Sequence, residues 1–295
     1  MTEDLTALNR QALDSAKQYM GRTGWGSIIL VVIALAGTFM TLSLYTQGEL
    51  SSWVALLLIA VFTYFAYTPL HEAVHGNIHG DKQPLKWLNE LCGYLVAPLI
   101  SIPFTSHKKE HMVHHRYTNQ GKKDPDFMVS AMAKGPVAAI VTVLHFLWLQ
   151  NSYYVTHYWK DAEIFERFIY CIEVFISIGW RAVFIAYFPT IETAFVIILG
   201  YLIGGFFTAY WFAFRPHMPY QDSARYRNTN AMILPVWMKP LEWFWLGQNL
   251  HVIHHLFPRV PFYCYPKLFR EIEPILRAQG TPIIGIYSRE PLELK

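Results

Sequence analysis

Four long apolar stretches dominate the hydrophobic pattern of the chain, at residues 26–46, 51–70, 168–190 and 194–214. A helix needs about 20 apolar residues to cross the hydrocarbon core of a bilayer, so each stretch predicts one transmembrane helix. Very short links, residues 47–50 and 191–193, separate the members of each pair. We therefore expect two hairpins, with the long segments between and beyond them on one common side of the membrane.

The distribution of basic residues indicates which side that is. Neither hairpin link contains Lys or Arg, whereas most of the 24 basic residues lie in segments 71–166 and 215–295. Cytoplasmic loops of membrane proteins carry an excess of Lys and Arg. The termini and the central segment are therefore expected to face the cytoplasm.

Three further segments fit helices outside the bilayer core. Residues 87–105 and 131–150 are apolar, but Pro98 and Pro103 interrupt the first, and Gly135 followed by proline interrupts the second. We interpret both as interfacial or cytoplasmic helices.

The N-terminal segment, residues 1–22, has Leu5, Leu8, Ala12 and Tyr19 at helical spacing. This pattern predicts an amphipathic helix that lies on the bilayer. The predicted fold is one all-α membrane domain over residues 1–295, with four transmembrane helices in two hairpins (26–70 and 168–214). A cytoplasmic helical cap completes it.

Composition supports a membrane protein and excludes two other classes. The chain is 53% apolar and 15% charged, against roughly 25% charged residues in a soluble domain. Its formal net charge of +3 gives no basic excess for nucleic-acid binding. Its three cysteines form no CxxC pair, so an iron–sulfur cluster on this chain is not expected.

Nine of the 13 histidines fall into clusters on the predicted cytoplasmic side. The spacing within each cluster, i to i+3 or i+4, puts its rings on one helix face. The set comprises His71 and His75; His111, His114 and His115; His251, His254 and His255; and His217 just beyond the fourth stretch.

Neutral imidazole is the commonest ligand for iron, zinc and copper, so nine converging rings indicate more than one metal ion. His145 and His157 stand alone and are interpreted as packing or surface residues. Ligand rings usually donate their second N–H to a carboxylate or carbonyl group. Candidates for such partners, or for extra ligands, are His79, His107, Glu72, Glu110, Asp124, Asp126 and Asn249.

The first cluster also reads as HExxH, in which two histidines bind zinc and Glu72 acts as the base of a metalloprotease. An intramembrane protease of this kind needs one more ligand, commonly an Asp in a later membrane helix. Neither 168–190 nor 194–214 contains Asp, and seven clustered histidines would have no role. A larger metal site therefore fits better.

Three motifs in order, HEAVH, HMVHH and HVIHHLFP, resemble the histidine boxes of the membrane fatty acid desaturase and hydroxylase superfamily, over residues 65–275. The segments HEAVHGNIH, 215–219 and 246–251 are most similar to bacterial desaturase-like β-carotene hydroxylases. The HHLFP ending is also similar to that of acyl-lipid desaturases.

The resemblance implies a non-haem di-iron centre that uses O₂ as co-substrate and is held by the nine clustered histidines. It implies a membrane oxidoreductase of the bacterial inner membrane. The leading interpretation is hydroxylation of a carotenoid ring. Desaturation or hydroxylation of a fatty acyl chain is the main alternative, and a histidine-rich zinc- or copper-binding membrane protein is a remote one.

Such an enzyme needs two electrons per turnover, and the sequence contains no flavin or nucleotide motif. We therefore expect an external donor of the ferredoxin or cytochrome type. The basic residues Lys108, Lys109, Lys122 and Lys123 are candidate contacts for an acidic carrier or for lipid headgroups. Two charged residues, Glu173 and Arg181, interrupt the third apolar stretch; they face either each other or a substrate passage.

Overall fold

The computed structural model describes residues 2–288 and is mostly helical. Four helices are long and apolar enough to cross a membrane, which confirms the four predicted stretches. They are α2 (Trp25–Thr46), α3 (Ser52–Val74), α7 (Ile164–Tyr187) and α8 (Ile191–Thr208). Helix α8 continues into the π-helical turn η3 (Ala209–Phe214) and the 3-10 helix η4 (Arg215–His217).

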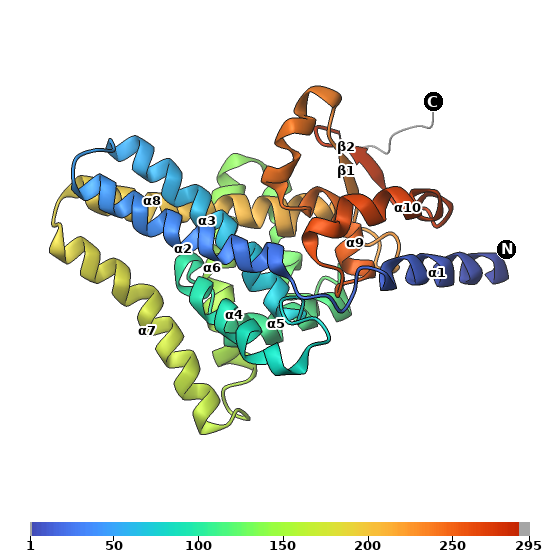
Figure 1. The fold of residues 1–295 in the computed structure, drawn as a ribbon, viewed down its shortest axis with the longest axis horizontal. Coiled ribbons are helices and arrows are strands. Elements are labelled where there is room, and N and C mark those ends of the chain that lie inside the picture. Colours follow the sequence, from blue (N-terminus) through green and yellow to red (C-terminus); the bar gives the residue numbers. More distant parts are fainter. Residues whose placement is uncertain (1, 289–295) are drawn as a thin grey trace.

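Helices α2, α3 and α8 lie side by side, with α3 packed against both others (Figure 1). Two glycines of α8 permit the close approach to α3. A Cβ atom on Gly204 would lie 2.6 Å from the Thr63 Cβ, and one on Gly200 would lie 2.9 Å from the Ile59 Cγ2. Small residues at such interfaces let helix backbones come close. As a result, α3 is the most buried of the four helices.

Helix α7 diverges from this group. It joins α8 through a short turn, runs away from α2 and α3, and is the least buried of the four (Figure 1). A cavity of about 850 Å³ lies between α7, α8 and α6 (Pro136–His157), lined largely by apolar side chains such as Leu144, Ile178 and Ile198. The second helix pair is therefore open along much of its length.

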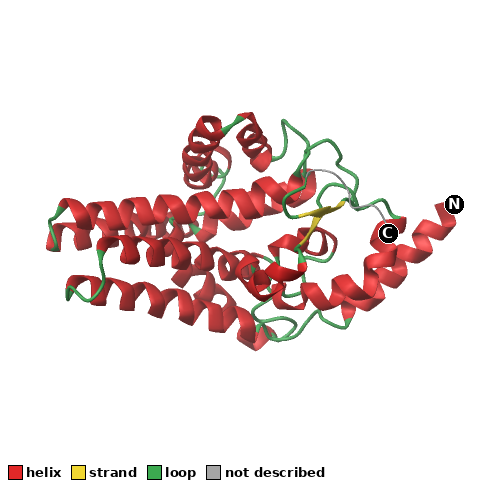
Figure 2. Cartoon of the chain, turned by 90° about the horizontal axis from the view of Figure 1, so that it is seen from above, coloured by secondary structure: helices red, strands yellow, loops and turns green. Residues whose placement is uncertain are grey.

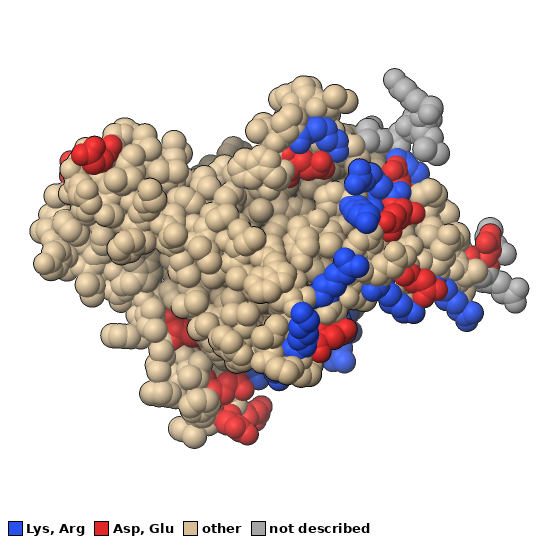
Figure 3. Space-filling model, viewed as in Figure 1, with Lys and Arg blue, Asp and Glu red and all other residues tan. Residues whose placement is uncertain are grey.

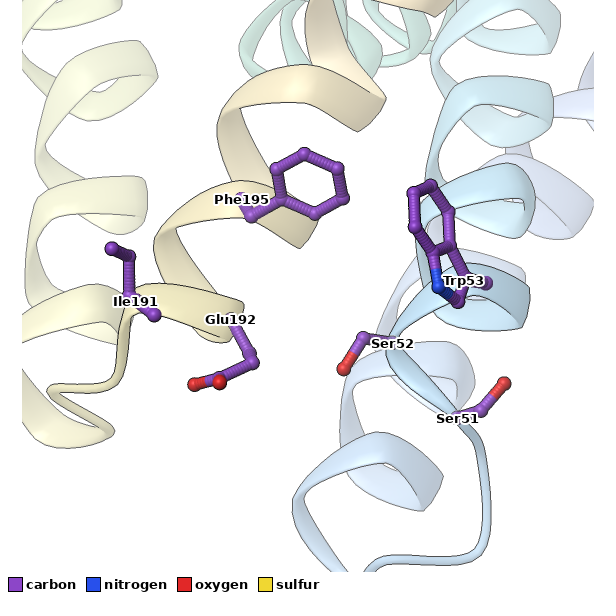
Figure 4. A pocket seen from close by; sticks show the side chains of 6 residues that line it. All are labelled: Ser51, Ser52, Trp53, Ile191, Glu192 and Phe195. Carbon is purple, nitrogen blue, oxygen red and sulfur yellow. The ribbon is translucent and has the colours of Figure 1, made fainter.

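The two short turns of the apolar helices approach each other at the end remote from the histidines. The rings of Trp53 and Phe195 meet edge to face there, with centroids 5.4 Å apart. They border a hollow of about 510 Å³, and the carboxylate of Glu192 lines it (Figure 4). Within the described part of the chain, its lining contains no histidine.

The segment predicted as an interfacial or cytoplasmic helix, 87–105, holds one helix and the start of a second, which meets the first at 95° and continues to Tyr117. After the short η1 (Gln83–Leu85), α4 (Lys86–Ile100) ends at Ser101, which has a left-handed φ of 53°, and α5 (Phe104–Tyr117) begins after Pro103. Proline lacks the N–H that would continue a helix, which explains the break. The 3-10 helix η2 (Pro125–Lys134) then leads into α6, which covers most of the second predicted interfacial segment.

The N-terminal amphipathic helix is present as α1 (Thr2–Lys17). Part of the apolar face that the pattern assigns to the bilayer is buried inside the protein, because α1 packs on α10 (Tyr265–Ala278). Ala12 and Ala16 have no exposed surface, and the Gln279 side chain donates a hydrogen bond to the Leu5 carbonyl.

The all-α prediction is wrong in one detail. Strands β1 (Ala231–Ile233) and β2 (Ile283–Gly285) form a two-stranded parallel sheet in the cap, with Ala231 paired to Ile283 (Figure 2). Such short strands, far apart in the chain, leave no period-two pattern to detect. Between the two strands, the chain forms η5 (Val236–Trp245), η6 (Gln248–Leu250), α9 (His251–Leu256) and η7 (Phe262–Cys264), followed by α10. Residues 289–295 of the predicted C-terminal segment lie outside the described residues.

Charged side chains follow the division between apolar helices and cap. On the face seen in Figure 3, Lys, Arg, Asp and Glu gather mainly over the cap, and the region of α2 and α3 carries almost none. Large apolar side chains such as Phe39, Phe175 and Val183 are exposed on the long helices. Exposed apolar surface on this scale fits lipid contact.

Candidate metal centre

The clustered histidines come together from four elements. His71 lies in the last turn of α3 and His75 follows that helix; α5, η4 and α9 supply the others. Candidate ligand atoms within 4.8 Å of one another define two groups. The first group is His71, His75, His111, His115 and His254, and the second group is His114, His217 and His255.

Ring nitrogens of the first group lie close to one another. The Nε2 atoms of His75 and His111 are 3.0 Å apart, and those of His111 and His115 are also 3.0 Å apart. The Nε2 atom of His115 lies 2.8 Å from that of His254. Two nitrogens bound at right angles to one metal ion, each at about 2.1 Å, lie about 3.0 Å apart. These separations fit a shared cation.

Two buried rings have no hydrogen-bond partner. Both ring nitrogens of His71 and both of His217 are buried, and none of the four has a hydrogen-bond partner among residues 2–288. Leaving a buried polar atom unpaired costs about 1–3 kcal/mol, so such atoms require an explanation. Metal ligation would satisfy one nitrogen of each ring. The histidines present therefore fit a pair of metal ions, one for each group.

The two groups adjoin each other. The rings of His115 and His255, one from each group, stack with centroids 4.4 Å apart. His251 belongs to neither group, but its ring lies 5.1 Å from that of His254 and 5.2 Å from that of His217. The structure thus gathers eight of the nine predicted ligands into two groups and places the ninth beside both.

Most of these rings are neutral at pH 7. Burial lowers the pKa of His111, His115, His254 and His255 well below 6.5, and neighbouring imidazoles lower it further. Burial likewise lowers the pKa of His251 to about 3. A neutral ring offers a nitrogen lone pair, which metal binding requires.

The comparison with known proteins agrees with this geometry. The model of the fatty acid desaturase family matches residues 50–287. The chain belongs to the fatty acid desaturase family. Its membership marks it as an oxidoreductase of the membrane and excludes the metalloprotease interpretation of HExxH.

Several relatives of this desaturase-family chain act on fatty acyl groups, according to their names. A fatty acid conjugase (FAC2 B) of Calendula officinalis is 22% identical over 261 residues, covering 76% of this chain and 69% of the relative. The sn-1 oleoyl-lipid 12-desaturase of Anabaena variabilis is 23% identical, covering 82% and 74%. The chloroplastic sn-2 acyl-lipid omega-3 desaturase (ferredoxin) of Arabidopsis thaliana is 24% identical, covering 90% and 64%.

Asp124 orients one ring of the second group. Its Oδ1 atom lies 2.8 Å from His114 Nδ1, and its other oxygen accepts the backbone N–H of Asn119 at 2.8 Å. Burial opposes protonation of His114, but the charges of Asp124 and Asp126 outweigh it and raise the pKa of this ring. Among the clustered histidines, His114 is therefore the one held closest to carboxylates.

Behind these residues, Glu110 and Asp126 form a buried acidic pair. Burial raises the pKa of Glu110 to about 7, and burial together with the Glu110 charge raises the pKa of Asp126. His107 lies beside them, with Nδ1 3.3 Å from Glu110 Oε2 and 3.1 Å from Gln150 Oε1. His107 belongs to neither histidine group, and burial lowers its pKa to about 4.

Two residues predicted as partners of the metal ligands, Glu72 and Asn249, form hydrogen bonds with other residues instead. Glu72 accepts hydrogen bonds from the Asn77 side chain at 3.1 Å and from the Phe262 backbone at 3.2 Å, so it ties the end of α3 to η7. Asn249 donates to Glu242 at 3.0 Å. Adjacent residues on a helix point in different directions, which explains why Glu72 does not face the metal groups with His71. His79, also predicted, joins neither group.

Three residues that were not predicted as partners form hydrogen bonds with candidate ligands. Gln248 Oε1 lies 2.7 Å from His251 Nδ1, the Tyr265 hydroxyl lies 3.2 Å from His254 Nδ1, and the Thr118 hydroxyl lies 3.4 Å from His255 Nδ1. Gln248 precedes its histidine by three residues, a spacing that is visible in the sequence. Tyr265 comes from another helix and gives no such signal.

Proposed function

We propose that this protein uses O₂ and a pair of histidine-bound iron ions to oxidise an unactivated C–H bond of a lipid-dissolved substrate. The observation that carries the proposal is the convergence of eight clustered histidines into two adjoining groups, with unpartnered buried nitrogens on His71 and His217. Bound iron would supply the activation of O₂, which no amino-acid side chain performs. The residues proposed to hold it are the nine clustered histidines.

The protein itself positions the substrate near the histidine groups and excludes water from them. His71 lies in the last turn of the apolar helix α3, which supports entry of a bilayer-dissolved substrate near the histidine groups. The ring of Phe212 lies 6.0 Å from that of His71 and 4.5 Å from that of Tyr67, and all three side chains are buried. These aromatic rings exclude water from the membrane side of the histidines.

A fatty acyl chain is the proposed substrate, because each relative described above is named for a fatty acyl substrate. Desaturation removes two hydrogen atoms from neighbouring carbons. Together with two electrons and two protons from outside, they reduce one O₂ to two H₂O. Hydroxylation of a carotenoid ring is the second candidate, favoured by the similarity of HEAVHGNIH and residues 215–219 to β-carotene hydroxylases.

The proposal also includes the side of the membrane on which the histidine groups lie and the type of protein that donates electrons. The lack of Lys and Arg in the two short links supports a cytoplasmic position for the histidine groups, in a bacterial inner membrane. The donor is proposed to be a separate carrier of the ferredoxin or cytochrome type. One relative, the omega-3 desaturase, carries ferredoxin in its name.

Product analysis in a bacterial host that accumulates β-carotene tests the substrate. We expect a new double bond in the acyl profile and unchanged carotenoids. A hydroxylated carotenoid with an unchanged acyl profile would show the second candidate to be correct. Metal analysis of protein purified from iron-replete cells should give about two irons per chain, and zinc alone without O₂ uptake would contradict both.

A further inference from the structure

A surface hollow of about 800 Å³ opens along the outer face of α5. Its lining includes His115 and His255, both of which are partly exposed, whereas six of the nine clustered histidines are buried. These two rings are the stacked pair that joins the first histidine group to the second. The hollow therefore gives a molecule at the surface direct contact with ligands from both groups.

The rim of the hollow is basic. Lys108, Lys109 and Arg116 line it, and the Lys123 ammonium lies 5.3 Å from the ring centroid of Tyr117, another lining residue. The two lysines on α5 have carboxylate partners: Lys108 lies 2.8 Å from Glu90, and Lys109 lies 3.0 Å from Glu166.

Arg116 is exposed, and among the described residues it has no carboxylate within ion-pair distance. Lys123 is likewise exposed and forms no ion pair within the described part of the chain. The rim presents an uncompensated positive charge, which attracts an acidic surface over about a Debye length.

The rim also carries apolar and aromatic surface of the kind found at protein interfaces. Met112 is 52% exposed, and Tyr117 and Tyr158 line the same hollow. Methionine, tyrosine and arginine are enriched in protein–protein contacts. A lipid phosphate would need only the basic residues for binding. It would not need contact with the partly exposed rings of His115 and His255, which also line the hollow.

We propose that this hollow is the docking site of an acidic one-electron carrier protein. The proposal rests on the proposed function and names its partner surface. Each docking oxidises the carrier by one electron and reduces the desaturase by one electron, so two dockings supply the two electrons of one turnover. His115 and His255 form the shortest contact between the docked carrier and the metal-binding groups.

Binding of a plant-type [2Fe–2S] ferredoxin to the purified full chain in detergent tests the docking site directly. At about 50 mM salt, Arg116→Glu is expected to raise the Kd by about fivefold or more. The difference should shrink at 300 mM salt, because salt screens exposed charges. The matched control, Arg270→Glu, reverses an exposed charge on α10 and should leave the Kd within about twofold. Equal Kd values for both variants would overturn the proposal.

A second measurement separates docking from the proposed function. Product formation by Arg116→Glu should slow with reduced ferredoxin and stay near wild type with dithionite, which needs no docking surface. Equal slowing with both reductants would mean that Arg116 acts on the site itself and would overturn the docking proposal. Lack of product from the wild type with either reductant would contradict the proposed function, whereas the ferredoxin Kd still decides the docking site.

The lipid that co-purifies with Arg116→Glu distinguishes a lipid site from a protein site. An altered content of anionic lipid with an unchanged ferredoxin Kd would identify the hollow as a lipid site and also overturn the proposal.

Discussion

Glu173 and Arg181 lie on the same face of α7, about two helical turns apart, and each binds one of the two helix ends that meet at the α4–α5 bend. Glu173 accepts hydrogen bonds from the backbone N–H groups at the start of α5, from Phe104 at 2.5 Å and from Thr105 at 3.2 Å. A carboxylate at a helix N-terminus satisfies free N–H groups and interacts favourably with the helix dipole.

Arg181 has the complementary role at the end of α4. Its guanidinium donates hydrogen bonds to the carbonyl oxygens of Pro98 at 2.9 Å and Leu99 at 2.6 Å. These carbonyls have no partner within the helix, because the last turn leaves them free. The two charges in the third apolar stretch therefore bind the bent helix pair rather than each other, and Arg181 also lines the cavity of about 850 Å³ between α6, α7 and α8. They hold the bent helix pair, and with it the histidines of α5, against α7.

We predict that Glu173→Ala lowers both stability and metal content. Two backbone N–H groups lose their acceptor in a buried place, at a cost of about 1–3 kcal/mol each. Glu173→Gln keeps an amide oxygen at the same place and should retain more of both properties. Thermal unfolding in detergent and iron content per chain check this. Equal behaviour of the two variants would show that the cap of α5 does not depend on an acceptor at this position.

The close contact between α8 and α3 predicts that alanine substitution destabilises the protein at Gly204 but not at Gly179. Gly204→Ala places a Cβ atom 2.6 Å from the Thr63 Cβ and 2.7 Å from the Ala60 carbonyl oxygen, so the helices must separate. Overpacking of this kind costs about 1–3 kcal/mol. Gly179→Ala on α7 adds a methyl group with no atom of the described residues within 4 Å and serves as the matched control. A lower Tm for Gly204→Ala and an unchanged or higher Tm for Gly179→Ala are expected. Equal shifts would argue against close α3–α8 packing.

Two histidines should differ sharply in their effect on metal binding. His254 belongs to the first group and its Nε2 atom lies 2.8 Å from that of His115, so His254→Ala is expected to reduce bound iron and abolish turnover. His157 is exposed at the end of α6, with its ring stacked on Tyr153 at 4.1 Å. His157→Ala should keep the iron and at least half of the turnover. Similar losses from both variants would contradict the assignment of the ligand set.

The histidine groups also predict the pH dependence of the metal-free protein. The pKa values of His111, His115, His254, His255 and His251 are lower in the folded state than the unfolded value near 6.5. Below pH 6.5 the unfolded chain therefore binds protons that the folded chain does not, and stability falls as the pH falls.

Three neighbouring groups act in the opposite direction. The pKa values of Glu110, Asp126 and His114 are raised, so each favours the folded state at lower pH and loses that contribution as the pH rises through its folded value. The depressed histidines outnumber them, so the net effect keeps its sign. We expect a lower Tm for metal-free protein at pH 5.5 than at pH 7.5, measured by calorimetry at constant ionic strength. A higher Tm at pH 5.5 would show that these rings are not buried as neutral groups.

The sequence by itself determined the four long helices and the three histidine clusters. Both are local patterns: a transmembrane helix satisfies its own backbone hydrogen bonds, and i, i+3 and i+4 spacing places rings on one helix face. The prediction that segment 87–105 is helical is correct, but it did not include the 95° bend between α4 and α5.

Only the tertiary structure decided how these parts combine. The two histidine groups each draw on three elements, and His115 meets His254 from a distant part of the chain. The same holds for the capping of the α4–α5 bend by Glu173 and Arg181. The role of Glu72 was set by Phe262, far away in the sequence, rather than by the adjacent His71. Spacing along one helix fixes only which side chains share a face, whereas the partner of each face depends on long-range packing, which no local pattern encodes.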